Sequence, residues 1–329
     1  MNECIGRIGG NDSMDILIQV VLLVVGFLML VKGADFFVEG AAGIAGKFGI
    51  PQLVIGLTIV AMGTSAPEAA VSITAALSGS ADLTVGNVVG SNIMNILVIL
   101  GITAILVPVA IQKSTLQIEL PFMIGISVLM VVLGYTGEVI TRIEGVVLGI
   151  FFCIYLAYLF YMAKKGKEEV EQGHKEKPMW LLIIATIGGA TLIVIGSDFV
   201  VDSASAIATV FGMSQSFIGL TIVAFGTSLP ELVTSVTAAR KGKADIAIGN
   251  IVGSNVFNIL FVTGITAMIT PVDYVLKSFF VDGFVMIGAG ILLLLGVLRA
   301  KKLKRPVGVL MLLCYAGYFA YLMMNLNAA

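Results

Sequence analysis

The sequence has little charge, one histidine and three scattered cysteines. Only 12% of its 329 residues are charged, whereas soluble domains carry about 25%, which argues against a water-soluble protein. His174 lies in a charged stretch, and Cys4, Cys153 and Cys314 stand alone. Neither a zinc or copper site nor a disulfide framework is therefore indicated. The basic residues occupy short connections and form no patch, which disfavours nucleic-acid binding.

Long apolar runs dominate the sequence. Hydrophobic residues make up 58% of the chain and recur in runs of about 20, the length of a membrane-spanning helix. The runs lack the alternation of a β-barrel, so we predict an all-α polytopic membrane protein. The first run is longer than the apolar part of a signal peptide and is expected to be retained. Ten transmembrane helices are predicted, at 14–38, 47–77, 83–108, 116–134, 143–163, 179–201, 210–239, 246–271, 278–298 and 306–325.

The chain repeats itself with a period of 163 residues. Residues 56–68, GLTIVAMGTSAPE, return at 219–231 as GLTIVAFGTSLPE, with eleven of thirteen positions identical. Residues 86–101 and 249–264, each built around Gly-Ser-Asn, agree at ten of sixteen positions. Each copy carries five predicted spans, and because five is odd the copies must cross the membrane in opposite directions. Two inverted five-helix repeats are typical of secondary transporters, which bind their substrates near the bilayer midplane between the repeats.

These features divide the chain into a polar leader (1–13), a first five-helix repeat (14–163), a hydrophilic linker (164–178) and a second five-helix repeat (179–329). Positive charge sets the orientation, because Lys and Arg favour the cytoplasmic side of short loops. With the N-terminus outside, sixteen Lys and Arg residues fall on the inner side and three on the outer side. Both termini are therefore predicted outside the cell membrane, with the linker in the cytoplasm.

Each repeat places a glutamate directly after a proline within an apolar run, at Glu68 and Glu231. The proline leaves a carbonyl four residues earlier without its helical partner, and a carboxylate at this depth is costly unless it is compensated. A cation would satisfy both groups. Spacing of four brings more oxygens to the same helix faces, in the pairs Thr64/Glu68, Ser91/Asn95, Thr227/Glu231 and Ser254/Asn258. Such hard oxygens suit Ca²⁺ or Na⁺, and one Ca²⁺, two Na⁺ or two protons would neutralise the glutamates.

These motifs resemble those of the calcium/cation antiporter superfamily, and within it the prokaryotic sodium/calcium exchangers. The resemblance rests on GTSAPE (63–68), GSNIMN (90–95), GTSLPE (226–231) and GSNVFN (253–258) and extends over nearly the whole chain. It implies a transporter without cofactor or enzyme activity, which exchanges Na⁺ for Ca²⁺, typically three for one, by alternating access. The first and sixth spans would slide against a core formed by the second, third, seventh and eighth.

The resemblance also implies a ligand set. Ca²⁺ would bind Glu68 and Glu231 directly, together with the carbonyls of Thr64 and Thr227. For Na⁺ it implies the hydroxyls of Ser65, Ser91, Ser228 and Ser254 with the carbonyls of Ala61 and Ala224, and it places Asn95 and Asn258 in the middle.

Other functions remain as alternatives. Ca²⁺/H⁺ antiporters of the same superfamily usually carry Glu in the Gly-Asn motif, where this chain has Ser91 and Ser254, which favours Na⁺. Asn258 stands where potassium-dependent relatives have Asp, which argues against potassium dependence. An intramembrane protease would need a base beside Ser65 or Ser228, and the sequence offers none nearby. A passive channel would carry Ca²⁺ without a counter-ion.

Several polar residues have simpler expected roles. Ser72 and Ser235, about one turn beyond the glutamates, are expected to serve helix packing, and Asp35 and Asp198 to lie at the water interface. The partners expected from the sequence are Ca²⁺, Na⁺ or H⁺ and the lipid bilayer. The oligomeric state is left open, and a monomer is compatible with the sequence.

Overall fold

The chain folds mainly into helices, some of them interrupted by π-helical turns (η). The computed structural model describes residues 10–79, 81, 83–165, 177–211, 213, 222, 224–274 and 276–326. The first half contains α1 (Gly10–Phe48), α2 (Gln52–Ile55), η1 (Gly56–Val60), α3 (Ala61–Thr64), α4 (Ala66–Leu77), α5 (Leu83–Met94), η2 (Asn95–Leu100), α6 (Gly101–Leu106), β1 (Val109–Ala110), η3 (Thr115–Glu119), α7 (Leu120–Gly137), β2 (Val139–Ile140) and α8 (Arg142–Lys165). The second half contains α9 (Met179–Val210), α11 (Ala224–Thr227), α12 (Leu229–Arg240), α13 (Ala244–Phe257), η5 (Asn258–Val262), α14 (Thr263–Ile269), β3 (Val272–Asp273), α15 (Leu276–Leu298), β4 (Lys302–Leu303) and α16 (Arg305–Leu326).

The membrane-spanning helices account for most of this structure. Within the described residues eight helices are long and apolar enough to cross a bilayer: Ile16–Phe48, Leu83–Leu106, Thr115–Gly137, Arg142–Lys165, Met179–Val210, Ala244–Ile269, Phe280–Leu298 and Arg305–Met324. The pair Gln52–Thr64 and Ala66–Leu77, bent by 49°, passes the same test as one broken span. The span predicted at 210–239 lies partly outside the described residues, as do residues 1–9 of the leader and 166–176 of the linker.

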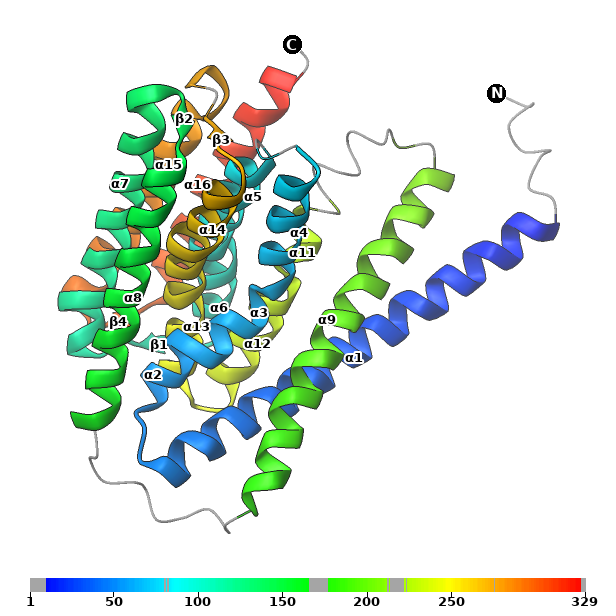
Figure 1. Ribbon diagram of the computed structural model, residues 1–329. Coiled ribbons are helices and arrows are strands. Elements are labelled where there is room, and N and C mark those ends of the chain that lie inside the picture. Colours follow the sequence, from blue (N-terminus) through cyan, green and yellow to red (C-terminus); the bar gives the residue numbers. More distant parts are fainter. Residues whose placement is uncertain are drawn as a thin grey trace.

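Helices α1 and α9 are longer than predicted, with 39 and 32 residues. The predictions ended α1 before Glu39 and α9 before Asp202, where charge interrupts the apolar run, but the helices continue to Phe48 and Val210. A helix of the length of α1 measures about 58 Å at about 1.5 Å per residue, which exceeds the hydrocarbon core of about 30 Å. In Figure 1 the two helices lie side by side and extend away from the bundle.

Glycines let α1 and α9 touch backbone to backbone. A Cβ atom on Gly33 would lie 2.9 Å from the carbonyl oxygen of Gly189, and one on Gly26 would lie 2.8 Å from that of Gly196. Small residues at such contacts are the usual means of close helix packing in membranes. Gly26 is equivalent to Gly189 in the 163-residue repeat, and Gly33 to Gly196, so equivalent glycines of the two halves meet in crossed, antiparallel pairs.

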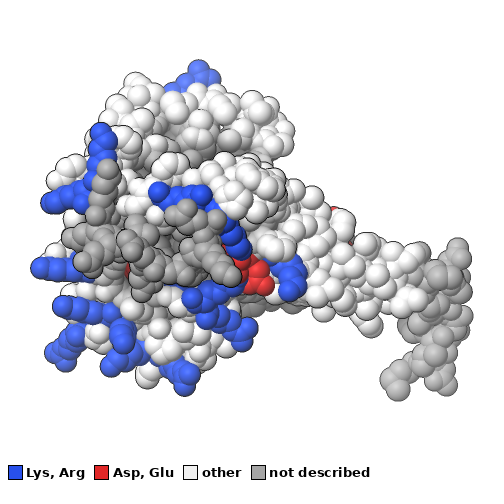
Figure 2. Space-filling model, turned by 90° about the horizontal axis from the view of Figure 1, so that it is seen from below, with Lys and Arg blue, Asp and Glu red and all other residues white. Residues whose placement is uncertain are grey.

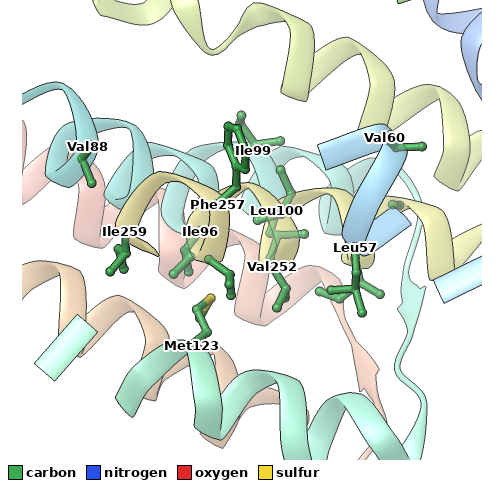
Figure 3. Close-up of a cluster of buried hydrophobic side chains, with 14 of the residues drawn as sticks. Leu57, Val60, Val88, Ile96, Ile99, Leu100, Met123, Val252, Phe257 and Ile259 are labelled. Atoms are coloured by element: carbon green, nitrogen blue, oxygen red, sulfur yellow. The ribbon is translucent and has the colours of Figure 1, made fainter. Parts of the chain in front are cut away.

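The helices of the Gly-Asn motifs are the innermost. In the most apolar windows of Leu83–Leu106 and Ala244–Ile269, 83% of the residues are buried, against 11–33% in the other six spans. Figure 3 shows Ile96 of the first and Val252 of the second in one apolar cluster with Met123 of α7. Polar side chains on helices that are buried all round must find partners in the protein or in a ligand.

Two short strand pairs join the halves outside the core. β1 pairs with β4 and β2 with β3, both antiparallel, so each pair takes one strand from each half. Pro108 and Pro271 stand directly before β1 and β3. They end α6 and α14, because a proline drives the preceding residue to an extended backbone, and Val107 and Thr270 are extended. Figure 2 shows Lys and Arg side chains gathered around the lower face of Figure 1, where α8 ends and α9 begins.

Lys241, in the turn after α12, connects the core to α1. Its Nζ lies 3.0 Å from Oδ1 of Asp35 and 2.8 Å from Oε1 of Glu39, and Nζ of Lys177 lies 3.4 Å from the other oxygen of Glu39. Asp35, predicted at the water interface, has a side chain that is 35% exposed. The residue equivalent to Lys241 in the first half is Ser78, so the repeat does not duplicate this ion-pair network.

Replacing Lys241 with methionine is expected to lower the free energy of unfolding by about 1 kcal/mol, because partly exposed ion pairs contribute up to about that much and salt screens them. Thermal unfolding in detergent at low and high salt measures the effect, which should shrink in high salt. Lys47→Met, which removes an exposed lysine from the last turn of α1, is the control and should change little. Equal losses in the two variants would contradict a stabilising network.

Candidate ion-binding site

The helix that carries Glu68 is broken at Gly-Thr-Ser. α3 ends at Thr64, Ser65 has φ −86° and ψ 8°, and α4 begins directly after it. Pro67 therefore stands in the first turn of α4, where its missing N–H costs no helical hydrogen bond. Glu68 lies in the same turn, where the positive end of the helix dipole favours a carboxylate.

The second copy of the motif repeats this geometry, with Ser228 (φ −90°, ψ 0°) before α12 and Glu231 in the first turn. Both glutamates are buried, Glu68 with 1% and Glu231 with 0% of its surface exposed. They are near enough to repel each other electrostatically, and neither forms an ion pair with a described lysine or arginine. Two buried like charges without a counter-ion are unstable, so the pair requires either a bound cation or protonation.

Side chains at the first break reach into the second half. Oγ of Ser65 donates a hydrogen bond to Oε1 of Glu231 at 2.8 Å. Oγ1 of Thr64 donates to Oδ1 of Asn250 at 3.0 Å. The hydroxyl of Ser254 also lies close enough to interact with the carboxylate of Glu231. The predicted residues Thr64, Ser65, Ser254 and Glu231 therefore come together from three helices of both halves.

Four buried oxygens at equivalent positions of the two halves have no hydrogen-bond donor among the described residues. They are Oε2 of Glu68, Oε2 of Glu231, Oδ1 of Asn95 and Oδ1 of Asn258. The hydroxyl of Ser228 is also buried and has no hydrogen-bond partner within the described part of the chain. Folded proteins pair nearly all buried polar atoms, and acceptors without donors are suited to a cation. An all-oxygen set fits Ca²⁺ or Na⁺ rather than zinc or copper.

The predicted backbone ligands are placed less completely. The carbonyl oxygen of Ala61 accepts hydrogen bonds from Oγ of Ser254 at 3.5 Å and from the backbone nitrogen of Ser65 at 3.0 Å. Ala224 and Thr227 belong to the short helix α11, and the side chain of Thr227 is half-buried. Much of the segment before α11 lies outside the described residues.

Two asparagines at the start of the Gly-Asn motifs were not among the predicted site residues. Nδ2 of Asn87 donates to the carbonyl oxygen of Glu68 at 3.1 Å and to Oγ of Ser72 at 2.9 Å. Asn250 makes the equivalent contacts in the second half, at 3.4 and 2.9 Å. The asparagines thus fasten each glutamate helix to a motif helix, and Ser72 serves helix packing as predicted. Asn87 and Asn250 occupy the same position in both copies of the Gly-Asn motif, and this repetition could have identified them from the sequence.

Comparison with known proteins gives consistent matches over nearly the whole chain. The family model described as sodium/calcium exchanger protein matches twice, at residues 18–161 and 181–324. A putative antiporter, CaxA, of Alkalimonas amylolytica is 40% identical, with 92% of this chain and 98% of the relative covered. The sodium/calcium exchanger MaX1 of Methanosarcina acetivorans is 32% identical over 93% of this chain and 99% of its own length.

Solved structures give the same result. The sodium-calcium exchanger NCX_Mj, in crystals soaked with zero Na⁺ and Ca²⁺, has a TM-score of 0.82 at 31% identity, with 93% of this chain and 99% of that chain covered. The same exchanger soaked with 10 mM Na⁺ and 10 mM Sr²⁺ has a TM-score of 0.81. The names of these proteins describe transporters and not enzymes.

Proposed function

Since the chain belongs to the sodium/calcium exchanger family, we propose that it is a Na⁺/Ca²⁺ antiporter that works by alternating access. The observation that carries the proposal is the set of four buried oxygens without donors, two of them from the carboxylates of Glu68 and Glu231. One Ca²⁺ or two Na⁺ would neutralise these carboxylates, and occupancy by one excludes the other. Mutually exclusive binding at one buried site is the basis of exchange.

We assign the ions to this site by the ligand set that the family resemblance implies. Ca²⁺ would bind between Glu68 and Glu231 with the carbonyls of Thr64 and Thr227. Asn95 and Asn258 would lie in the middle of the site. Na⁺ would bind the hydroxyls of Ser65, Ser91, Ser228 and Ser254 and the carbonyls of Ala61 and Ala224. The proposed stoichiometry of three Na⁺ to one Ca²⁺ is the one that the family resemblance implies. Potassium is not expected to take part, because Asn258 adds no further negative charge.

For the architecture we propose ten transmembrane helices in two inverted repeats, 14–163 and 179–329, joined by the linker 164–178. Contacts between equivalent residues support it. The glycines of α1 and α9 meet in crossed pairs, and β1 and β2, which are equivalent to β3 and β4 in the repeat, also pair crosswise. A two-fold relation between the halves would produce such crossing, and it would bring the proposed site to the region where the halves meet.

We further propose that the protein lies in the cell membrane with both termini outside. The charge bias of the sequence supports this orientation. The concentration of Lys and Arg on the lower face in Figure 2, at the ends of α8 and α9 that flank the linker, supports it as well. That face would be cytoplasmic.

Proteoliposomes loaded with Na⁺ are expected to take up radioactive Ca²⁺ when they are diluted into Na⁺-free medium at the same pH on both sides. Uptake should cease when an ionophore collapses the Na⁺ gradient, and the reversal potential would give the ion ratio. Uptake that follows an imposed pH gradient without Na⁺ would instead identify a Ca²⁺/H⁺ antiporter. Flux that needs no counter-ion would identify a channel.

A further inference from the structure

Two buried asparagines outside the predicted ligand set, Asn92 and Asn255, meet between the halves. They are equivalent in the 163-residue repeat, and each is 1% exposed. Nδ2 of Asn92 donates to the backbone carbonyl oxygen of Asn255 at 3.4 Å, and Nδ2 of Asn255 donates to that of Asn92 at 3.3 Å. A carbonyl oxygen can only accept, so each contact fixes which end of the amide is nitrogen.

The outer helices reinforce this orientation. Nδ2 of Asn92 lies 3.8 Å from Sδ of Met286, and Nδ2 of Asn255 lies 3.7 Å from Sδ of Met123. A thioether sulfur accepts weakly and cannot donate, so it also favours nitrogen on its side. Met123 of α7 and Met286 of α15 are again equivalent in the repeat, so both halves hold their asparagine in the same way.

The fixed amides in turn orient the asparagines of the ion site. Oδ1 of Asn255 accepts a hydrogen bond from Nδ2 of Asn95 at 2.9 Å, and Oδ1 of Asn92 accepts from Nδ2 of Asn258 at 3.3 Å. Nδ2 of Asn258 also donates to Oγ of Ser91 at 3.1 Å, and that hydroxyl gives its own proton to a backbone carbonyl at 2.7 Å. The Nδ2 atoms of Asn95 and Asn258 thus both donate hydrogen bonds to protein groups.

We propose that Asn92 and Asn255 are positioning residues of the ion site, which hold the amides of Asn258 and Asn95 with oxygen, and not nitrogen, available to a cation. The oxygens left over are the two Oδ1 atoms that are buried without a donor. A reversed amide would lose one ligand and turn two N–H donors toward a positive charge. This inference rests on the proposed cation site, and it adds to that site two residues that orient its ligands without contacting an ion.

Double-mutant cycles on Na⁺ affinity, measured by calorimetry on the detergent-solubilised full chain, test the proposal. Asn255→Leu keeps the size of the side chain but removes its hydrogen bonds, and it is expected to weaken binding about tenfold, as loss of residues that orient metal ligands does. Asn95→Ala removes the oriented oxygen itself. The double variant should bind no more weakly than Asn95→Ala alone, because Asn255 acts only through Asn95.

The crossed pair is the control. Asn255→Leu with Asn258→Ala should show effects that multiply, because Asn92 and not Asn255 orients Asn258. Thr103→Val, which removes a buried hydroxyl bonded within its own helix at 2.7 Å, should leave the affinity unchanged. The cycle of Asn92→Leu with Asn258→Ala repeats the measurement if Asn255→Leu does not fold.

The outcomes distinguish a failure of the positioning role from a failure of the proposed transport function. Multiplying effects in the Asn95/Asn255 and Asn92/Asn258 pairs would overturn the positioning role and leave these asparagines as packing residues. A wild-type protein that binds neither Ca²⁺ nor Na⁺ would overturn the proposed function itself. Coupling restricted to the pairs that share a hydrogen bond would support the positioning role.

Discussion

Glutamine in place of Glu68 is expected to abolish Ca²⁺ transport in a protein that still folds. The amide matches the carboxylate in shape but removes one of two negative charges from a site that no described lysine or arginine compensates. A unit charge at about 4 Å contributes on the order of 4 kcal/mol at an effective dielectric constant of about 20. We therefore expect Ca²⁺ affinity to fall at least about 100-fold, measured as Na⁺-driven uptake and by calorimetry. Glu231→Gln should behave alike.

Glu119 provides a matched control for this experiment. It is a second buried glutamate in a membrane helix, 1% exposed, but its carboxylate accepts a hydrogen bond from Tyr158 at 2.5 Å outside the candidate site. Glu119→Gln should keep Na⁺-driven uptake, since it changes buried charge without touching the ion ligands. Undiminished transport by Glu68→Gln, or equal loss in both variants, would be incompatible with the site as described.

Alanine in place of Gly253 is expected to damage transport and stability together. A Cβ atom there would lie 2.7 Å from Cβ of Ala61 and 2.8 Å from both Cα and the carbonyl oxygen of Leu57. These are backbone or near-backbone atoms of η1 and α3, which cannot rotate away. Overpacking of this kind costs about 1–3 kcal/mol. It would also displace the Ala61 carbonyl, and small displacements of binding groups can lower rates by about 100-fold.

Thermal unfolding and initial uptake rates measure the effect of Gly253→Ala. Gly125→Ala in α7 is the control, because a Cβ atom there meets no described atom within 4 Å, and Gly-to-Ala changes in open helix positions stabilise by up to about 1 kcal/mol. Stabilisation by Gly253→Ala as well would mean that α13 and η1 can separate without consequence for the ions.

The motif residues could be predicted because each motif occurs twice in the chain. The repetition of Gly-Thr-Ser-x-Pro-Glu singles out Glu68 and Glu231 in apolar surroundings, and the spacing of four adds Ser254 and Asn258 on the same faces. The broken helices follow from proline and glycine chemistry, which acts locally along the chain. Both glutamates are buried in the structure, in agreement with that reasoning.

What the sequence could not supply are contacts between distant segments. Asn92 differs from Asn95 in no local property, and only the packing of the halves shows that it bonds Asn258 and not an ion. The residue equivalent to Lys241 in the first half is Ser78, which carries no charge, so the repeat gave no reason to pair Lys241 with α1. The ends of α1 and α9 were misplaced for a related reason: charge at Glu39 and Asp202 interrupts hydropathy, but tertiary contacts continue the helix.

The crossed glycine contacts between α1 and α9 have a mechanical consequence. Because the backbones touch where Gly33 meets Gly189 and where Gly26 meets Gly196, neither helix can move along the other without collision of main-chain atoms. We therefore expect α1 and α9 to move together, as a single rigid body. In the proposed antiporter, a joint movement of α1 and α9 would couple the two halves of the chain, because each half contributes one helix of the pair.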